Sequence, residues 1–178
     1  FFNKKTSFKY PLLRKNILGS AGMHQKVIKN YKDLYNFDSK KHILQKNIIG
    51  QEYGMDILND FNGKYVHSFA RKKIVMKNGE TDKARVIKNR KFIKFAKLIS
   101  QKFKHIGPMD VDFIMTPKGK IYFIDFNTRF GGGYPITHLS GFNYIKALIL
   151  MRNGKKTNFK KNFKVHSFSK GIAIYKNF

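Results

Sequence analysis

The residues best placed to do chemistry lie in the segment 109–135, which reads MDVDFIMTPKGKIYFIDFNTRFGGGYP. The run PKGK at 117–120 has turn chemistry and separates two apolar runs, so the sequence predicts a β-hairpin there. If those four residues form the loop, Thr116 pairs with Ile121. Counting outward from that pair places two aspartates directly opposite each other, one on each strand.

Those aspartates are Asp112 and Asp125, and like charges so placed are destabilising unless a positive charge lies between them. Asn127 follows two residues after Asp125 and shares its face if the strand continues. Two carboxylates and an amide oxygen suit Mg²⁺, with Mn²⁺ as an alternative. Arg129 could then hold a phosphate in bidentate fashion. In the structural alternative, Asp125 only ends a strand and Asp112 faces solvent.

The composition describes a basic chain with enough apolar residues to form a core. It has 178 residues, 42% of them hydrophobic, no cysteine and a formal net charge of +27. A disulfide framework and a thiolate site are therefore excluded, and no apolar run is long enough for a membrane span. The charge fits either a nucleic-acid-binding surface or a compositional bias, and its even spread favours the bias over a specific nucleic-acid partner. We expect a cytoplasmic protein without a membrane partner.

The elements that must position these residues are read from periodicity, caps and turns. Strands are expected, beside the hairpin, at 10–15, 25–28, 42–45, 51–60, 64–76, 80–87 and 171–175, with the one at 42–45 buried. The three strands from 51 to 87 are joined by the turns Asn62-Gly63 and Asn78-Gly79 and are expected to form an antiparallel meander. Helices are expected at 31–35, capped by Asn30, at 90–104, capped by Asn89, and at 143–151. The helix at 90–104 is predicted to bury a stripe of apolar residues and to stop at Gly107-Pro108: Phe92, Phe95, Ala96, Ile99 and Phe103. The loop 17–23 either cradles a phosphate or is an ordinary turn.

Taken together, these segments resemble the ATP-grasp superfamily, and within it the carbamoyl phosphate synthase large-chain-like proteins. The most specific match is IDFNTRFGGGYP at 124–135, which resembles the motif acidic residue-x-Asn-Pro-Arg followed by glycines. A second match runs from Leu44-Gln45 to Gln51-Glu52 and resembles the adenine hinge with its ribose-binding glutamate. The resemblance implies an α+β ATP-grasp fold, with a small subdomain at 1–41 and a large one, built on an antiparallel sheet, at 42–178.

The resemblance also implies roles for single residues. Lys15 would reach the nucleotide phosphates, and the loop folding over them would include Gly19, Ser20 and Gly22. Gln45, Lys46 and Ile48 would lie along the adenine, and Glu52 would bind the ribose. Asp112, Asp125 and Asn127 would hold Mg²⁺ beside ATP. Arg129 would stabilise the transferring phosphoryl group. Apart from the resemblance, we select Arg71, on the strand 64–76, as a contact of the acyl phosphate or the substrate carboxylate; in the alternative reading it is a solvated strand residue.

Several positions depart from the family pattern. Asp125 replaces a glutamate, Thr128 a proline, Gln45 an acidic residue and Asn16 a proline. The chain opens with Phe-Phe, without Met, and lacks the N-terminal α/β domain that such proteins carry. We therefore expect a fragment that can be inactive alone.

The predicted function is ATP- and Mg²⁺-dependent ligation, in which a carboxylate is activated as an acyl phosphate and attacked by an amine or another nucleophile. The partners would be these small substrates, and a homodimer is left open. The first alternative is a degenerate module that binds nucleotide without turnover, favoured by Asp125 and Gln45. The second is a basic nucleic-acid-binding protein.

Overall fold

The computed structural model describes residues 9–19, 25–77, 79–159 and 163–171, and the chain divides into two units, Phe1–Ile49 and Gly50–Phe178. The predicted subdomain boundary lay earlier, after Lys41. The strand that follows Lys41 groups with the first unit because it pairs there with the first strand of the chain. That the two units are the two nucleotide-clamping subdomains stays a prediction.

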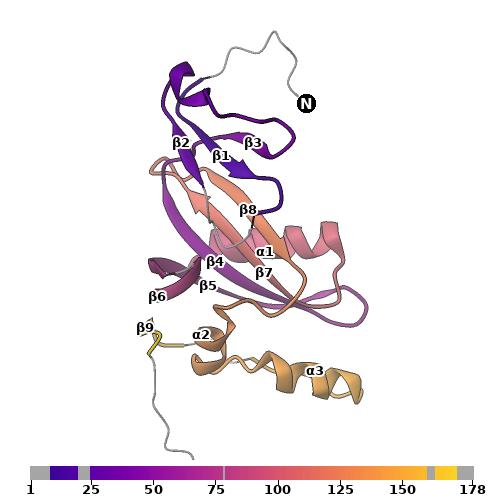
Figure 1. Ribbon diagram of the computed structural model, residues 1–178. Coiled ribbons are helices and arrows are strands. Elements are labelled where there is room, and N and C mark those ends of the chain that lie inside the picture. Colours follow the sequence, from indigo (N-terminus) through magenta and orange to yellow (C-terminus); the bar gives the residue numbers. More distant parts are fainter. Residues whose placement is uncertain (1–8, 20–24, 78, 160–162, 172–178) are drawn as a thin grey trace, which may run out of the picture. The chain divides into compact units, whose positions relative to one another are not determined.

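The first unit contains a three-stranded antiparallel sheet in the order β2-β1-β3 (Figure 1). Its strands are β1 at Leu12–Asn16, β2 at Lys26–Ile28 and β3 at His42–Lys46, close to their predicted positions. The prediction that the third of these is buried was wrong, because its residues are half-buried or exposed. Among the strands that the structure describes, β3 is an edge strand and pairs only with β1.

A single helical turn, η1 at Tyr31–Leu34, follows β2 where the short helix was predicted. Its cap is the predicted one, since the side chain of Asn30 accepts a hydrogen bond from the backbone N–H of Lys32 at 3.0 Å. The carboxylate of Asp33 in turn accepts one from the backbone N–H of Asn30 at 3.3 Å. These reciprocal bonds form a capping box.

The second unit is built on a six-stranded antiparallel sheet in the order β8-β7-β4-β5-β6-β9 (Figure 1). The strands run as follows: β4 at Gln51–Asn59, β5 at Tyr65–Lys77, β6 at Glu80–Ile87, β7 at Gly107–Met115, β8 at Ile121–Asn127 and β9 at Ser167–Ser169. β4, β5 and β6 form the predicted meander. Gly63 lies in the first turn with a φ of 73°, which a glycine adopts without strain. The strand predicted at 171–175 lies almost entirely outside the described residues.

Helix α1 at Arg90–Phe103 covers one face of this sheet. Asn89 caps its start as predicted, accepting a hydrogen bond from the backbone N–H of Lys91 at 2.9 Å. Phe92, Ala96 and Ile99 of the predicted stripe are buried against β4 and β7, whereas Phe103 is 55% exposed. The helix ends within one residue of its predicted end, with Lys104 as a C-cap whose φ of 48° is left-handed. The Gly-Pro pair that was predicted to stop the helix instead begins β7.

A second apolar core forms where helices α2 at Tyr134–Leu139 and α3 at Tyr144–Arg152 meet β5 and β6. Helix α3 was predicted and α2 was not. Pro135 lies in the first turn of α2, where proline is tolerated because its missing N–H would be unpaired there. No helix of the described ranges is both long and apolar enough to cross a membrane.

His67 of β5 is enclosed by the aromatic rings of this second core. Its ring centroid lies 4.6 Å from that of Phe142 and 4.6 Å from that of Phe159. A hydrogen bond of 2.9 Å joins its Nδ1 to the hydroxyl of Tyr144. Burial lowers the pKa of His67 to about 4 from an ordinary value of 6.5. The ring is therefore neutral at pH 7, and protonating it works against folding.

This burial predicts a pH-dependent stability that one substitution should remove. A histidine whose pKa falls on folding stabilises the fold above pH 6.5, and the contribution is lost as the pH falls through about 4. His67→Asn retains a polar group near Tyr144 but cannot titrate. We expect the unfolding free energy of the wild type to fall by about 3 kcal/mol more than that of the variant across this range. Urea denaturation at several pH values, with His166→Asn as an exposed control, measures the difference. Parallel pH profiles of the wild type and His67→Asn would contradict it.

Candidate functional site

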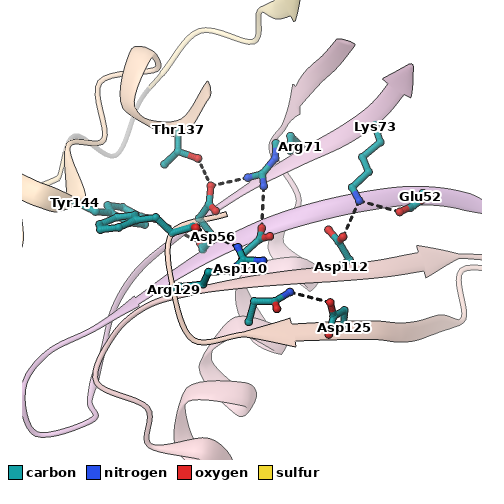
Figure 2. Close-up of polar contacts among 12 residues, drawn as sticks. Glu52, Asp56, Arg71, Lys73, Asp110, Asp112, Asp125, Arg129, Thr137 and Tyr144 are labelled. Atoms are coloured by element: carbon teal, nitrogen blue, oxygen red, sulfur yellow. Dashed lines mark hydrogen bonds and ion pairs between the residues drawn. The ribbon is translucent and has the colours of Figure 1, made fainter. Parts of the chain in front are cut away.

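Half of the chain's acidic residues lie on one face of the six-stranded sheet. Side chains two residues apart along a strand share a face, and the strand registers align those faces across β4, β5, β7 and β8. The acidic residues on this face are Glu52, Asp56, Asp110, Asp112 and Asp125, five of the ten in the sequence. Arg71 and Lys73 of β5 share the face, which we call the polar face (Figure 2).

Asp112 and Asp125 are directly opposite each other in the register of β7 and β8, as predicted. The pairing used to derive this was wrong, because Ile121 pairs with Met115 rather than with Thr116. A bulge on β8 restores the register, since Phe113 pairs with Phe123 and the next pair is Asp112 with Asp125. The extra residue, Ile124, has no partner in this register. The bulge therefore keeps both carboxylates on the polar face.

Lys73 places a positive charge between two of the carboxylates. Its ammonium lies 2.8 Å from Oε1 of Glu52 and 2.8 Å from Oδ2 of Asp112. The Lys73 side chain is only 5% exposed. Burial lowers the pKa of Lys73, but the carboxylates of Asp112 and Glu52 together raise it by more than burial lowers it. The net shift of the Lys73 pKa is therefore upward. Lys73 is thus held in its charged form beside the predicted ribose and metal ligands.

The end of β8 carries the other two predicted metal ligands. Oδ2 of Asp125 accepts a hydrogen bond from the side-chain amide of Asn127 at 2.8 Å, so the two side chains meet on the same face. Asp125 is exposed and Asn127 is half-buried. Across the described ranges, no group of three or more His, Cys, Asp or Glu residues is arranged to hold a metal ion. A site here therefore needs the amide oxygen of Asn127 as a third ligand.

Arg71 is the buried basic residue of the polar face, with 1% of its surface exposed. Its Nη1 donates to Oδ2 of Asp56 at 2.5 Å, and its Nη2 donates to Oδ1 of Asp110 at 2.9 Å (Figure 2). Thr137 of α2 donates its hydroxyl to the same oxygen of Asp56. This geometry gives no support to the predicted contact between Arg71 and a substrate carboxylate. Both terminal nitrogens of the guanidinium, Nη1 and Nη2, already donate to buried carboxylates of the protein.

Burial and the charge of the ion-pair partner act in opposite directions on the pKa values of Arg71 and Asp110. Burial raises the pKa of Asp110 to about 6, against the lowering effect of Arg71. Burial also opposes the charge of Arg71, but Asp56 and Asp110 outweigh it and raise the pKa of Arg71. The arginine therefore stays charged, and its positive charge offsets the cost of burying the two aspartates.

Arg129 follows β8 by two residues and is exposed. Its Nη1 donates to the backbone carbonyl of Phe130 at 3.1 Å. The three glycines after Phe130 then lead into α2. Arg129 can therefore reach a ligand on the polar face without leaving a buried ion pair.

The remaining predicted residues belong to the first unit. Lys15 lies in β1 opposite Ile43, and Gln45 lies in β3 opposite Leu13. Lys46 ends β3, while Gly19 and Ile48 lie outside its strands. Ser20 and Gly22 lie outside the described residues. The roles predicted for these residues stay predictions.

Sequence reasoning did not assign Asp56, Lys73, Asp110 or Thr137 to the site. Two of them carried a usable signal, because Asp110 precedes Asp112 by two residues and Lys73 follows Arg71 by two, so each shares its neighbour's face. Asp56 lies in the apolar run GMDIL, where an unpaired charge is costly. Thr137 carried no signal, because its helix was not predicted.

A hollow of about 710 Å³ also opens on the second unit. Tyr53, Lys72, Arg85 and Lys88 are among the residues that line it. Tyr53 and Lys72 point to the face opposite Arg71, whereas Lys73 of the polar face also lines the hollow. It brings together none of the predicted metal ligands.

Comparison with known proteins adds four findings. A family described as "ATP-grasp in the biosynthetic pathway with Ter operon" matches residues 38–171. The small subunit of 2-oxoglutarate carboxylase from Hydrogenobacter thermophilus is 24% identical over 181 residues, covering 84% of this chain and 36% of that protein. The solved biotin carboxylase domain of the same enzyme, a dimer with MgADP, ADP and bicarbonate, has a TM-score of 0.67 at 20% identity.

The match to the biotin carboxylase domain covers 85% of this chain and 38% of the chain in that structure. The L-amino acid ligase of Bacillus licheniformis has a TM-score of 0.61 at 20% identity, covering 81% of this chain and 39% of its own. The chain thus spans well under half the length of these relatives. The shared architecture confirms the predicted fold class, α+β with an antiparallel sheet.

The bridge between Glu52 and Asp112 predicts a specific loss of stability. Lys73→Met keeps the length of the side chain but removes the charge that both carboxylates contact. We expect the unfolding free energy at pH 7 to fall by about 1–3 kcal/mol. Urea denaturation measures this, with Lys72→Met as the matched control on the other face of β5. Equal effects of the two substitutions would show that the bridge contributes nothing to folding.

Proposed function

The chain belongs to the ATP-grasp family, and from that premise we propose that it forms the nucleotide-clamping part of a magnesium- and ATP-dependent ligase. In the proposed reaction a carboxylate oxygen bonds to the γ-phosphorus of ATP as the bond to ADP breaks. An amine or another nucleophile then displaces phosphate from the acyl phosphate. The observation that carries the proposal is the meeting of Asp112, Asp125 and Asn127 on one face of the sheet.

The donor set of the polar face fits a hard cation. Asp112, Asp125 and Asn127 offer two carboxylates and an amide oxygen. Bound there, Mg²⁺ or Mn²⁺ would neutralise charge on the nucleotide phosphates.

The other residues would bind and orient the nucleotide. Glu52 would accept hydrogen bonds from the ribose, and its carboxylate is already oriented by Lys73 at 2.8 Å. We propose that Lys15 contacts the phosphates, with the backbone of Gly19, Ser20 and Gly22 folding over them. Gln45, Lys46 and Ile48 would line the adenine.

Arg129 is the arginine that we propose for catalysis. It is exposed and unpaired with any carboxylate in the described part of the chain, so it can turn its guanidinium toward a phosphoryl group. Arg71 is not proposed to touch substrate, because Asp56 and Asp110 occupy it. Catalysis would rest on positioning and charge neutralisation, as phosphoryl transfer requires.

The substrates and setting follow from the same chemistry. We propose a small carboxylate and a small nucleophile as partners, and a cytoplasmic location, where ATP is supplied. A homodimer is proposed as the assembly, since the biotin carboxylase domain named above is itself a dimer. These proposals on substrates, location and assembly concern the whole protein.

Asp125→Asn tests the metal-binding proposal with little change in volume. We expect it to weaken Mg²⁺-dependent binding of a non-hydrolysable ATP analogue about tenfold or more, a loss of about 1.4 kcal/mol, by removing one anionic ligand. Binding without Mg²⁺ should change little. Calorimetry on the full-length protein, with and without Mg²⁺, measures both, and Asp82→Asn in β6 is the matched control. Unchanged affinity in Asp125→Asn would make the hairpin purely structural.

Turnover separates the enzyme from a module that only binds nucleotide. We expect the full-length protein to release phosphate from ATP when it is offered a pool of carboxylates and amines. Metal-dependent binding without phosphate release would favour the binding module.

A further inference from the structure

A buried group of charged side chains joins three strands next to the loop that carries Arg129. Arg71 of β5 donates to Asp56 of β4 at 2.5 Å and to Asp110 of β7 at 2.9 Å, and all three residues are buried (Figure 2). We call these three residues the ion cluster. Such clusters are costly to bury, and replacing one with apolar residues is often neutral or stabilising. A role beyond stability is therefore worth seeking.

Glycines enclose this cluster where a larger residue would not fit. A Cβ on Gly133 would lie 2.1 Å from Nε of Arg71, and one on Gly54 would lie 3.1 Å from the same atom. A Cβ on Gly131 would lie 2.2 Å from Oδ2 of Asp110. The loop before α2 thus packs its backbone directly on the ion cluster.

The segment from β8 to α2 contacts the cluster at four successive points. Asn127 pairs with Asp110 across the sheet, and Gly131 packs on the carboxylate of the same residue. Gly133 packs on Arg71, and Thr137 donates its hydroxyl to Asp56. The order of these points along the chain fixes the path of the segment.

We infer that the ion cluster is a positioning device that sets the direction of Arg129 toward the polar face. Only residues 128–130 separate the two points at which the segment meets Asp110, and Arg129 is the middle one. The cluster residues touch no substrate and act through the loop. This inference rests on the proposed role of Arg129, although the positioning of the loop can be tested without it.

The three adjacent glycines supply a matched test. Gly133 has a φ of −89°, which alanine adopts easily, so Gly133→Ala acts through the clash with Arg71 alone. Gly132→Ala is the control, because its Cβ would meet only the Glu80 carboxylate, at an ordinary 3.5 Å. Both variants remove a glycine from the same turn.

Amide hydrogen exchange in the full-length protein reports on the loop without requiring activity. We expect Gly133→Ala to lose exchange protection at residues 127–134, while peptides from α1 keep theirs. Gly132→Ala should match the wild type in both regions. Unchanged protection in Gly133→Ala would overturn the inference.

Kinetics test the consequence for Arg129. In Gly133→Ala we expect kcat to fall about a hundredfold, because a displaced group loses its alignment, while the KM for ATP stays close to the wild-type value. A change in KM with an unaltered kcat would contradict positioning of a transition-state contact.

A second variant decides the case if Gly133→Ala does not fold. Thr137→Val is isosteric and removes only the hydroxyl that donates to Asp56. It should produce the same local loss of protection, with a smaller fall in kcat, and wild-type behaviour in both would overturn the inference. If the wild type has no ligase activity, the proposed function fails, and hydrogen exchange still tests the ion cluster.

Discussion

Charge balance across one sheet face is the constraint on which the rest of this structure depends. Carboxylates from three neighbouring strands point to the same side, and each would cost several kcal/mol to bury alone. Arg71 offsets Asp56 and Asp110, while Lys73 offsets Asp112. The two basic residues are neighbours on β5, so this central strand supplies the positive charge that holds the polar face together.

The two faces of the sheet therefore have different tasks. The face under α1 is apolar and packs Phe92 against Tyr53 and Phe113. The polar face gives up some of that burial and carries the groups that can act on a ligand. Its loop to α2 packs on Arg71, so the chemistry is anchored to buried structure rather than to a free loop. The chain as a whole has a net charge of +27, yet five of its ten acidic residues lie on this face. The composition does not account for that clustering, so the clustering is a feature of the site.

Particular elements show why the sequence predicted some features and missed others. The meander and α1 were found because turn glycines, caps and periodicity are local signals. The opposition of Asp112 and Asp125 was correct although the turn pairing was one residue off, because the bulge at Ile124 shifted the register back. A bulge depends on packing against neighbouring strands, which a single strand does not encode. Arg71 was assigned to substrate because burial and partners from distant strands cannot be read from its position in the chain.

By itself, the sequence determined the ATP-grasp resemblance, the strand order of the meander and the shared face of Asp125 and Asn127. These follow from local turn chemistry and from the two-residue period of a strand. Only the tertiary structure decided which charges are paired, because Arg71 meets an aspartate 15 residues before it and another 39 residues after it. Contacts of that separation exist only once the strands are aligned, and burial then determines whether an arginine holds the fold or faces a ligand.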